Sequence, residues 1–395
     1  MNSFVQYAPT KIIFGKGVED QVGAQVKAFG GTKVLIHYGG GSVKRSGLLD
    51  KVKASLEAEG IAYVELGGAV PNPRLGLVHE GIELCRKEGV DFVLGIGGGS
   101  AIDSAKAIAL GVPYDGDVWD AFTRKVTLTK TLPHGNIITL AATGSETSNS
   151  AVITNDVDGS MLKRGLGADT NRPAFTLMDP ELLYSLPPYQ TACGIVDIMM
   201  HTHERFFSKG GQNEVSDKLA VAILRTMIQF GPVCMKEPDN YEARSEVMWA
   251  GSISHNGMTG LGRAGDWGSH QLEHALGGIY DVAHGAGLAA VWGSWARYVY
   301  KEDVMRFARY AVDVWDITMN YDDPEQTALA GIEAAEKFFV SIGMPICITD
   351  LLGHEPSDEE LKRLAYECSF YSTRKIGNFK VLDETDMYNI YVMAK

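Results

Sequence analysis

Residues 90–110, VDFVLGIGGGSAIDSAKAIAL, contain the pattern that decides the fold of this chain. Residues 90–96 form a short apolar run that predicts a buried strand, and residues 101–110 have helical periodicity. Between them lie Gly97, Gly98, Gly99 and Ser100. A glycine run at such a junction lets backbone N–H groups approach an anion at the positive end of the helix. The segment predicts a pyrophosphate-binding loop. The alternative is a plain tight turn, because the glycine spacing is not that of a conventional Rossmann fingerprint.

Strand and helix patterns alternate on both sides of this loop. Further strands are predicted at residues 33–37, 61–66, 137–141 and 175–178, and helices at residues 48–59 and 75–88. This alternation predicts a parallel sheet with right-handed crossovers, whose ligands bind outside the carboxyl ends of the strands. Asp158-Gly159, between short apolar runs at 151–154 and 161–164, predicts a hairpin.

After about residue 185 the strand patterns stop and helical periodicity takes over. Helices are predicted at residues 191–208, 214–230, 241–255, 283–300, 304–315 and 326–342. The sequence therefore predicts an α/β, Rossmann-like dinucleotide-binding domain over residues 1–185. A helical domain is predicted over residues 186–395.

Composition excludes several classes of protein. The 395 residues carry a formal net charge of −13 and no long run of Lys or Arg, which argues against nucleic acid or an anionic membrane as a partner. We expect no membrane span, because no apolar stretch looks long enough, and no signal peptide. The five cysteines form no Cys-x-x-Cys pair, which favours reduced thiols and a cytoplasmic location.

A second glycine cluster follows the predicted strand at 33–37. Gly39, Gly40, Gly41 and Ser42 stand where a dinucleotide fold reads the adenosine ribose, and no acidic residue is present to bind the 2′-hydroxyl of NAD. Ser42, Lys44 and Arg45 suit a 2′-phosphate instead, so the segment favours NADP over NAD. The alternative is a flexible loop with ordinary surface charges. Thr143 and Ser145 follow the strand at 137–141 and have hydroxyls that can bind ribose or phosphate.

Six of the ten histidines lie between residues 201 and 284, which is denser than scattered core histidines would be. Asp197 and His201 are four residues apart on a predicted helix, as are His270 and His274, so each pair shares a face. Imidazoles with one carboxylate are a ligand set for Zn²⁺ or Fe²⁺. Spacing alone favours His270 with His274 and leaves His284 optional. His203 faces another side of its helix than His201, and His255 is interpreted as structural.

Four segments together resemble the iron-containing alcohol dehydrogenase family. They are GGGSAIDSAK (97–106), TGSE (143–146), the Asp197-x-x-x-His201 pair and HQLEHALGGIYDVAHGAGLA (270–289). YGGGSVKRSG (38–47) points to its butanol dehydrogenase, or aldehyde reductase, branch. One departure is Ala283, where many members have Pro. The resemblance covers essentially the whole chain.

The resemblance implies a site as well as a fold, namely an all-α metal-binding domain of the dehydroquinate synthase-like kind after the dinucleotide-binding domain. Asp197, His201, His270 and His284 would bind the metal, Fe²⁺ or Zn²⁺, and His274 would lie beside it near the nicotinamide. Gly97 to Ser100 and Asp103 would hold the pyrophosphate region. Thr139, Thr143 and Ser145 would line the cofactor, NADP or NAD, and Lys163 would contact the nicotinamide ribose.

The predicted function is hydride transfer between NAD(P)H and small uncharged aldehydes or primary alcohols, because no basic cluster near the histidines would hold an anionic substrate. Two alternatives are open: a polyol or glycerol-type dehydrogenase, and a dehydroquinate synthase-like metal-dependent lyase. A homodimer is expected, since residues 3–14 can pair as an edge strand with a second copy.

Overall fold

The computed structural model describes residues 2–210 and 213–395, which fold as two compact units. One unit is Tyr7–Ser185. The other is Leu186–Lys395 together with the N-terminal residues up to Gln6.

The first unit is built on a six-stranded, fully parallel sheet with the strand order β1-β8-β5-β4-β2-β3. In that order the strands are Lys11–Phe14, Phe175–Met178, His134–Ile138, Phe92–Gly97, Lys33–Tyr38 and Ala62–Leu66. After β2 the chain adds β3 on one side and then β4 on the other. The strand order therefore reverses between β2 and β4, which is where open α/β sheets bind ligands.

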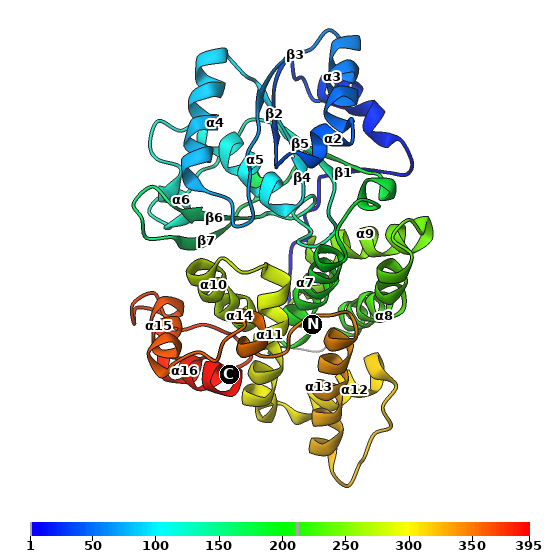
Figure 1. Ribbon diagram of the computed structural model, residues 1–395, viewed down its shortest axis with the longest axis vertical. Helices are drawn as coiled ribbons and strands as arrows, with labels where there is room; N and C mark the ends of the chain where they lie inside the picture. Colours follow the sequence, from blue (N-terminus) through cyan, green and yellow to red (C-terminus); the bar gives the residue numbers. More distant parts are fainter. Residues whose placement is uncertain (1, 211–212) are drawn as a thin grey trace. The chain divides into compact units, whose positions relative to one another are not determined.

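Helices cover both faces of this sheet (Figure 1). Val34 and Ile36 of β2 pack with α1 (Val22–Ala28) and α3 (Leu48–Ala58). The intervening Leu35 packs on the opposite face with α4 (Leu75–Glu88) and α5 (Gly99–Gly111). Side chains on both faces of β2 are buried, which explains its almost continuous apolar sequence. The short helices α2 and α6 span Ser42–Arg45 and Trp119–Phe122.

Two predicted elements of this unit needed correction. β5 begins at His134, three residues before the predicted strand, because the polar His134 and Asn136 are buried and hydrogen-bonded within the unit. The hairpin forms as a separate antiparallel pair, β6 (Ser150–Asn155) and β7 (Leu162–Gly167). Its connection is a loop of six residues instead of a tight two-residue turn, with Gly159 at φ 75°.

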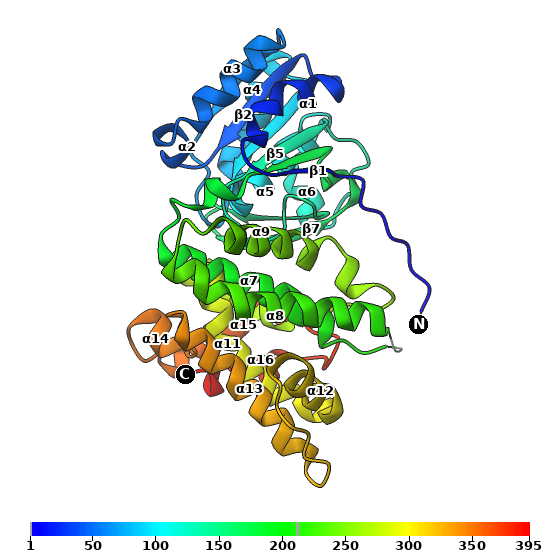
Figure 2. The same cartoon turned by 90° about the vertical axis from the view of Figure 1, so that its right-hand side faces the viewer.

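The second unit is helical in the part that the structure describes. Its helices are α7 (Pro188–Phe206), α8 (Glu214–Lys236), α9 (Tyr241–His255), α10 (Gly268–Tyr280), α11 (His284–Val299), α12 (Val304–Trp315), α13 (Pro324–Ser341), α14 (Ile348–Leu352), α15 (Asp358–Cys368) and α16 (Glu384–Met393). This unit also has short 3-10 helices at Met258–Gly260 and Tyr300–Glu302, and the first unit has them at Val18–Gln21, Asp169–Asn171 and Pro180–Leu183. Helices α7 and α8 lie side by side (Figure 2). Helix α8 includes Pro232 and ends at Lys236, six residues beyond its predicted end at residue 230.

Among the described residues, α8 is long and apolar enough to cross a membrane on length and composition alone. An 18-residue window has a mean hydropathy of 1.3, and 33% of it is buried. The expectation that no stretch has this length was wrong. Core helices of folded domains pass the same test, so one such helix is weak support for a membrane span.

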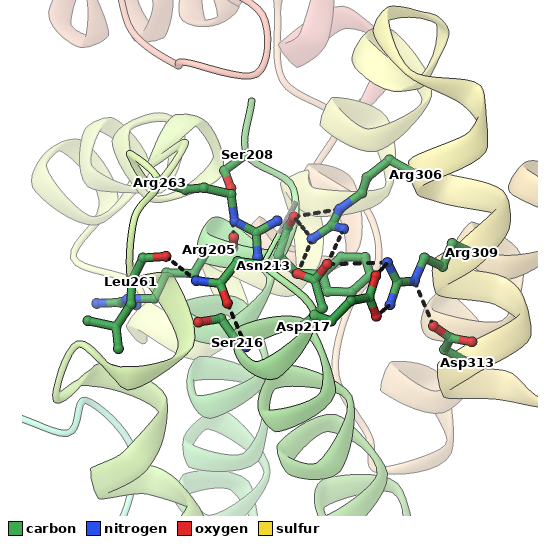
Figure 3. Close-up of polar contacts among 12 residues, drawn as sticks. Arg205, Ser208, Asn213, Ser216, Asp217, Leu261, Arg263, Arg306, Arg309 and Asp313 are labelled. Atoms are coloured by element: carbon green, nitrogen blue, oxygen red, sulfur yellow. Dashed lines mark hydrogen bonds and ion pairs between the residues drawn. The ribbon is translucent and has the colours of Figure 1, made fainter. Parts of the chain in front are cut away.

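A buried ion-pair network joins the helices of this unit around Asp217, near the start of α8 (Figure 3). Arg306 of α12 grips the carboxylate with two hydrogen bonds of 2.6 and 2.7 Å. Its Nε also donates to the carbonyl of Phe206, the last residue of α7, at 2.8 Å. Arg263 and Arg309 bind the same carboxylate. Asp217 therefore fixes the end of α7 relative to α12 and to the loop before α10.

Candidate functional site

Three helices of the second unit bring one carboxylate and three imidazoles together. Asp197 and His201 lie on α7, His270 lies on α10 and His284 opens α11. Asp197 Oδ1 is 3.2 Å from His201 Nδ1, 3.8 Å from His270 Nε2 and 3.7 Å from His284 Nε2. Ligands at 2.0–2.1 Å from a tetrahedral ion are separated by about 3.3 Å. Asp197, His201 and His270 therefore have the spacing of one coordination sphere. His284 Nε2 approaches the same carboxylate oxygen, although its ligand atoms also group with those of Glu273 and His274.

The hydrogen bonding of these atoms also fits a cation. Asp197 Oδ1, His201 Nδ1 and His270 Nε2 are buried without a hydrogen-bond partner in the described residues. Most buried polar atoms in folded proteins have such a partner, so three adjacent exceptions require an explanation. A divalent ion bound between them would satisfy all three.

Two further carboxylates, which the sequence analysis did not single out, orient the imidazoles. Glu204 Oε1 accepts a hydrogen bond from His270 Nδ1 at 2.8 Å, and Glu273 accepts one from His284 Nδ1. Both carboxyl groups are buried. Each leaves the Nε2 atom of its histidine directed at Asp197, the arrangement that usually supports a metal-binding imidazole. No spacing in the sequence contained this signal, because each glutamate binds a histidine of another helix or turn: Glu204 of α7 binds His270 of α10, and Glu273 of α10 binds His284 of α11.

The pKa values show how protons compete for this cluster. Burial, with the neighbouring His255 and His270, lowers the pKa of His201 well below its ordinary value of 6.5. Its imidazole is therefore neutral and able to bind a metal. Burial would also lower the pKa of His270, but Asp197 and Glu204 outweigh it and raise that pKa to about 9. Without a cation His270 holds a proton, which an arriving metal ion displaces.

The other histidines of this unit lie in different surroundings. His274 is half-buried on α10, with its ring 5.8 Å from that of His284, and its ligand atoms group with those of Glu273 and His284. His203 is buried and stacks on Trp292 at 4.7 Å. Burial lowers the pKa of His203 to about 3. The ring of His255 meets that of His201 edge-on, at 4.1 Å.

In the first unit, three adjacent strands bring the predicted cofactor segments to one edge of the sheet (Figure 1). Residues 39–42 follow β2, residues 97–100 join β4 to α5, and residues 139–145 follow β5. The carboxyl ends of parallel strands lie at the same edge, so the order β5-β4-β2 gathers all three segments beside the switch point.

The start of α5 forms a cradle of bare backbone. Gly98, the N-cap, supplies no side-chain cap for the free N–H groups of the first turn. A Cβ on Gly98 would lie 3.1 Å from Leu140 Cβ, and one on Gly99 would lie 2.4 Å from Thr143 Oγ1. The neighbouring segment therefore leaves no room for a side chain on Gly99 unless Thr143 shifts, and little room for one on Gly98. Free N–H groups at a helix N-terminus fit a phosphate ligand.

The other residues predicted to contact the cofactor differ in burial and in their hydrogen bonds. Asp103 is turned toward the segment after β5, where it accepts hydrogen bonds from Ser145 Oγ at 2.5 Å and from Val152 N at 2.9 Å. Ser145 is only 3% exposed. Thr139 is half-buried directly after β5, and Lys163 is half-buried on β7. Gly40, Gly41 and Ser42 are exposed after β2.

A phosphate-binding edge on a doubly wound sheet and an oriented carboxylate–imidazole cluster on a helical unit are together typical of a metal-dependent oxidoreductase that uses a dinucleotide. Comparison with known proteins agrees with this class. Residues 9–180 match the family description "Iron-containing alcohol dehydrogenase", and residues 191–394 match "Fe-containing alcohol dehydrogenase family, C-terminal".

Individual relatives cover the whole chain. NADH-dependent butanol dehydrogenase A of Clostridium acetobutylicum is 42% identical over 393 residues, 99% of each chain. The NADPH-dependent aldehyde reductase YqhD of Escherichia coli is 37% identical over 89% of each chain. The crystal structure of NADH-dependent butanol dehydrogenase A from Thermotoga maritima superposes with a TM-score of 0.95 at 37% identity, covering 100% of this chain and 99% of that one.

The chain belongs to the iron-containing alcohol dehydrogenase family. It is an alcohol dehydrogenase or aldehyde reductase that uses a nicotinamide dinucleotide and a metal, and it has the family's Rossmann-like and helical units. This confirms the family, fold and activity predicted from the sequence.

Proposed function

We propose that this enzyme interconverts small uncharged aldehydes and primary alcohols of about the size of butanol, with Asp197, His201, His270 and His284 as the metal ligands. The relatives named for butanol support the substrate class. The observation that carries the ligand assignment is the convergence of three imidazoles on Asp197 Oδ1. When bound, a divalent ion supplies Lewis-acid polarisation of the substrate oxygen, and the dinucleotide gives or takes the hydride.

The chain's own residues supply order and proton transfer. Glu204 and Glu273 hold the Nδ1–H groups of His270 and His284, so the Nε2 atoms of both rings remain free for the ion. His274 is half-buried beside His284, which allows it to exchange a proton with solvent. We assign His274 the delivery of the proton that aldehyde reduction consumes, and its return in alcohol oxidation. A carboxylate with three imidazoles suits both Fe²⁺ and Zn²⁺.

We assign the cofactor as NADP in preference to NAD. Lys44 Nζ lies 5.3 Å from the centre of the Tyr38 ring, and Arg45 Nη1 lies 2.5 Å from where a Cβ on Gly41 would stand. Two cations thus flank the glycine turn. The more similar relatives are named NADH-dependent, and YqhD is named NADPH-dependent, so the names divide. Changing Lys44 and Arg45 to Ala should raise the KM for NADPH and leave that for NADH. Equal effects on both would overturn the preference.

The remaining dinucleotide contacts are proposed at the edge of the sheet. Gly97, Gly98, Gly99 and Ser100 would hold the pyrophosphate, with Gly39 to Ser42 at the ribose end. Thr139, Thr143 and Lys163 would face the nicotinamide half.

Three properties of the whole protein complete the proposal. A cytoplasmic location is supported by its free thiols at Cys85, Cys193, Cys234, Cys347 and Cys368. Of residues 3–14, which were expected to pair as an edge strand, only Lys11–Phe14 form one, β1. The edge position of β1 supports a homodimer, since one side of this short strand can pair with a second copy. The domain assignment is residues 1–185 for the dinucleotide and 186–395 for the metal and catalysis.

Substrate profiling tests the proposed activity. Purified enzyme should oxidise NADPH or NADH with butanal and reduce the dinucleotide with butanol, and its kcat/KM should be lower with glycerol and other polyols. A higher kcat/KM with polyols would identify a polyol dehydrogenase. Substrate turnover without net dinucleotide oxidation would identify a lyase.

A further inference from the structure

A fully buried ammonium lies under the segment that follows β5. Lys106, two turns into α5, has no exposed surface. Its Nζ donates to Ser145 Oγ at 2.8 Å, to the Ser150 carbonyl at 2.8 Å and to the Ser148 carbonyl at 3.2 Å. An ammonium has three donors, and here each one meets an oxygen of the same short segment. Burying a lysine is costly without such partners, so the position is specialised.

Asp103, one turn earlier on α5, completes the arrangement. The Ser145 hydroxyl donates its hydrogen to Asp103 and accepts from Lys106, so it links both charges. With its only hydrogen used in this way, Ser145 has no donor left for a phosphate. Asp103 also accepts from Val152 N. The two charged side chains of α5 thus fasten residues 145–152 along the helix.

This fastened segment continues directly into the phosphate cradle. Ser145 N donates to Thr143 Oγ1 at 3.1 Å, and Thr143 is the side chain that fills the space beside Gly99. Any shift of residues 145–150 therefore moves Thr143 relative to the first turn of α5. The width of the cradle depends on the anchor beneath it.

We propose that Lys106 is a positioning residue for the dinucleotide: by holding residues 145–150 against α5, it sets the distance between Thr143 and the free N–H groups at the start of that helix. This inference rests on the proposed dinucleotide site. Lys106 acts through the segment and does not touch the cofactor. Lys106 should therefore affect neither the binding of the aldehyde substrate nor the binding of the metal ion.

The protonation of Lys106 predicts that dinucleotide binding depends on pH. Burial lowers the pKa of Lys106 to about 8, although Asp103 and Glu146 oppose the shift, and Arg172 adds to it. Lys163 faces Asp103 from β7. When Lys106 loses its proton it loses one of its three donors. The Kd for the dinucleotide should therefore rise as the pH is raised through about 8.

The test compares Lys106→Met, Ser145→Ala and the control Lys125→Met, an exposed lysine of the same unit paired with Asp120. The Kd for NADPH and NADH is measured by nucleotide fluorescence, with metal content, melting temperature and the KM for butanal on the same preparations. K106M should raise the Kd by about tenfold or more, the equivalent of one or two lost hydrogen bonds. The Kd of K106M should not change with pH near 8, unlike that of the wild type. Metal content and the KM for butanal should not change.

Each outcome decides a different claim. If the wild type binds neither dinucleotide, the proposed function fails. If the wild type binds but K106M binds equally well, the role of Lys106 is refuted. If K106M does not fold, S145A decides: a Kd raised severalfold supports the anchor, and an unchanged Kd refutes it.

Discussion

Replacing Glu204 with Gln tests whether the carboxylates behind the histidines contribute to metal binding. Glu204 Oε1 accepts hydrogen bonds from His270 Nδ1 at 2.8 Å, from Ser269 Oγ at 2.6 Å and from His270 N at 3.0 Å. Gln keeps an oxygen acceptor but removes the charge, and hydrogen bonds to a charged group are roughly twice as strong as neutral ones. The variant should therefore lose about 1 to 3 kcal/mol of metal-binding free energy, which corresponds to a roughly ten- to hundredfold higher Kd for the ion.

The assay is competition for Fe²⁺ or Zn²⁺ with a chelator of known affinity, followed by metal analysis of the recovered protein. Glu246→Gln is the control, because Glu246 is exposed on the neighbouring α9. E204Q should lose its metal at a lower chelator concentration than the wild type and E246Q. The reasoning about Glu204 would be wrong if E204Q folded, as judged by its melting temperature, and still held the ion as tightly as the wild type.

Three further predictions concern other parts of the molecule. Asp217→Asn should lower the free energy of unfolding by about 3 to 5 kcal/mol, because three arginines lose a buried carboxylate, whereas the surface change Asp313→Asn should cost less than about 1 kcal/mol in the same denaturant titration. His203→Phe should make the metal-free protein less sensitive to acid. The pKa of His203 is lowered by burial to about 3, so this residue alone costs the wild type about 2 kcal/mol as pH falls from 6.5 to 5. The variant should lose that much less stability than the wild type, because His37, His134 and His201 remain buried and neutral in both. If the unfolding free energies of the wild type and His203→Phe fell equally between pH 6.5 and 5, His203 would not be a buried neutral imidazole that destabilises the protein in acid. Gly99→Ala should raise the Kd for the dinucleotide, because its methyl group would meet Thr143, whereas Gly167→Ala, which has open space, should bind normally; equal binding by both would show that the start of α5 is not the cradle.

The fold of the first unit was largely predictable because its signals are local. The continuous apolar runs of β2 and β4, with glycine runs where each strand ends, predicted the parallel sheet and its binding edge. The errors arose where tertiary contacts override local pattern. β5 starts at a histidine because the imidazole of His134 is hydrogen-bonded to the Asn171 carbonyl inside the unit. The wide hairpin is held by Asn155, whose side chain accepts from Val157 N.

The metal cluster was predictable only in part. The four-residue spacing of Asp197 and His201 placed two members on one face of a helix. Spacing alone favoured His274 over His284, whereas the family resemblance implied His284. The choice depends on how α10 and α11 approach α7, which is information held in packing between distant residues. Glu204 and Glu273 were missed because a buried carboxylate next to an imidazole looks, in sequence, like any helical glutamate.

In the dinucleotide segments the sequence identified the right segments but not the role of each residue in them. The family resemblance implied that Asp103 holds the pyrophosphate region and that Ser145 lines the cofactor. In the structure both side chains hydrogen-bond within the chain, where they fasten residues 145–152 to α5 together with Lys106. Sequence motifs identify which residues gather at a site, but not which of them face the ligand.

The central claim is that one divalent ion, bound by Asp197 and three histidines, makes aldehyde reduction possible. The most direct measurement is metal content and butanal-dependent NADPH oxidation on the same preparation, for the wild type, for chelated wild type resupplied with Fe²⁺ or Zn²⁺, and for His270→Ala. We predict about one ion per chain, loss of activity on chelation with recovery on resupply, and neither ion nor activity in the variant. Full activity in wild-type protein free of metal, or an H270A variant that keeps both ion and activity, would contradict it.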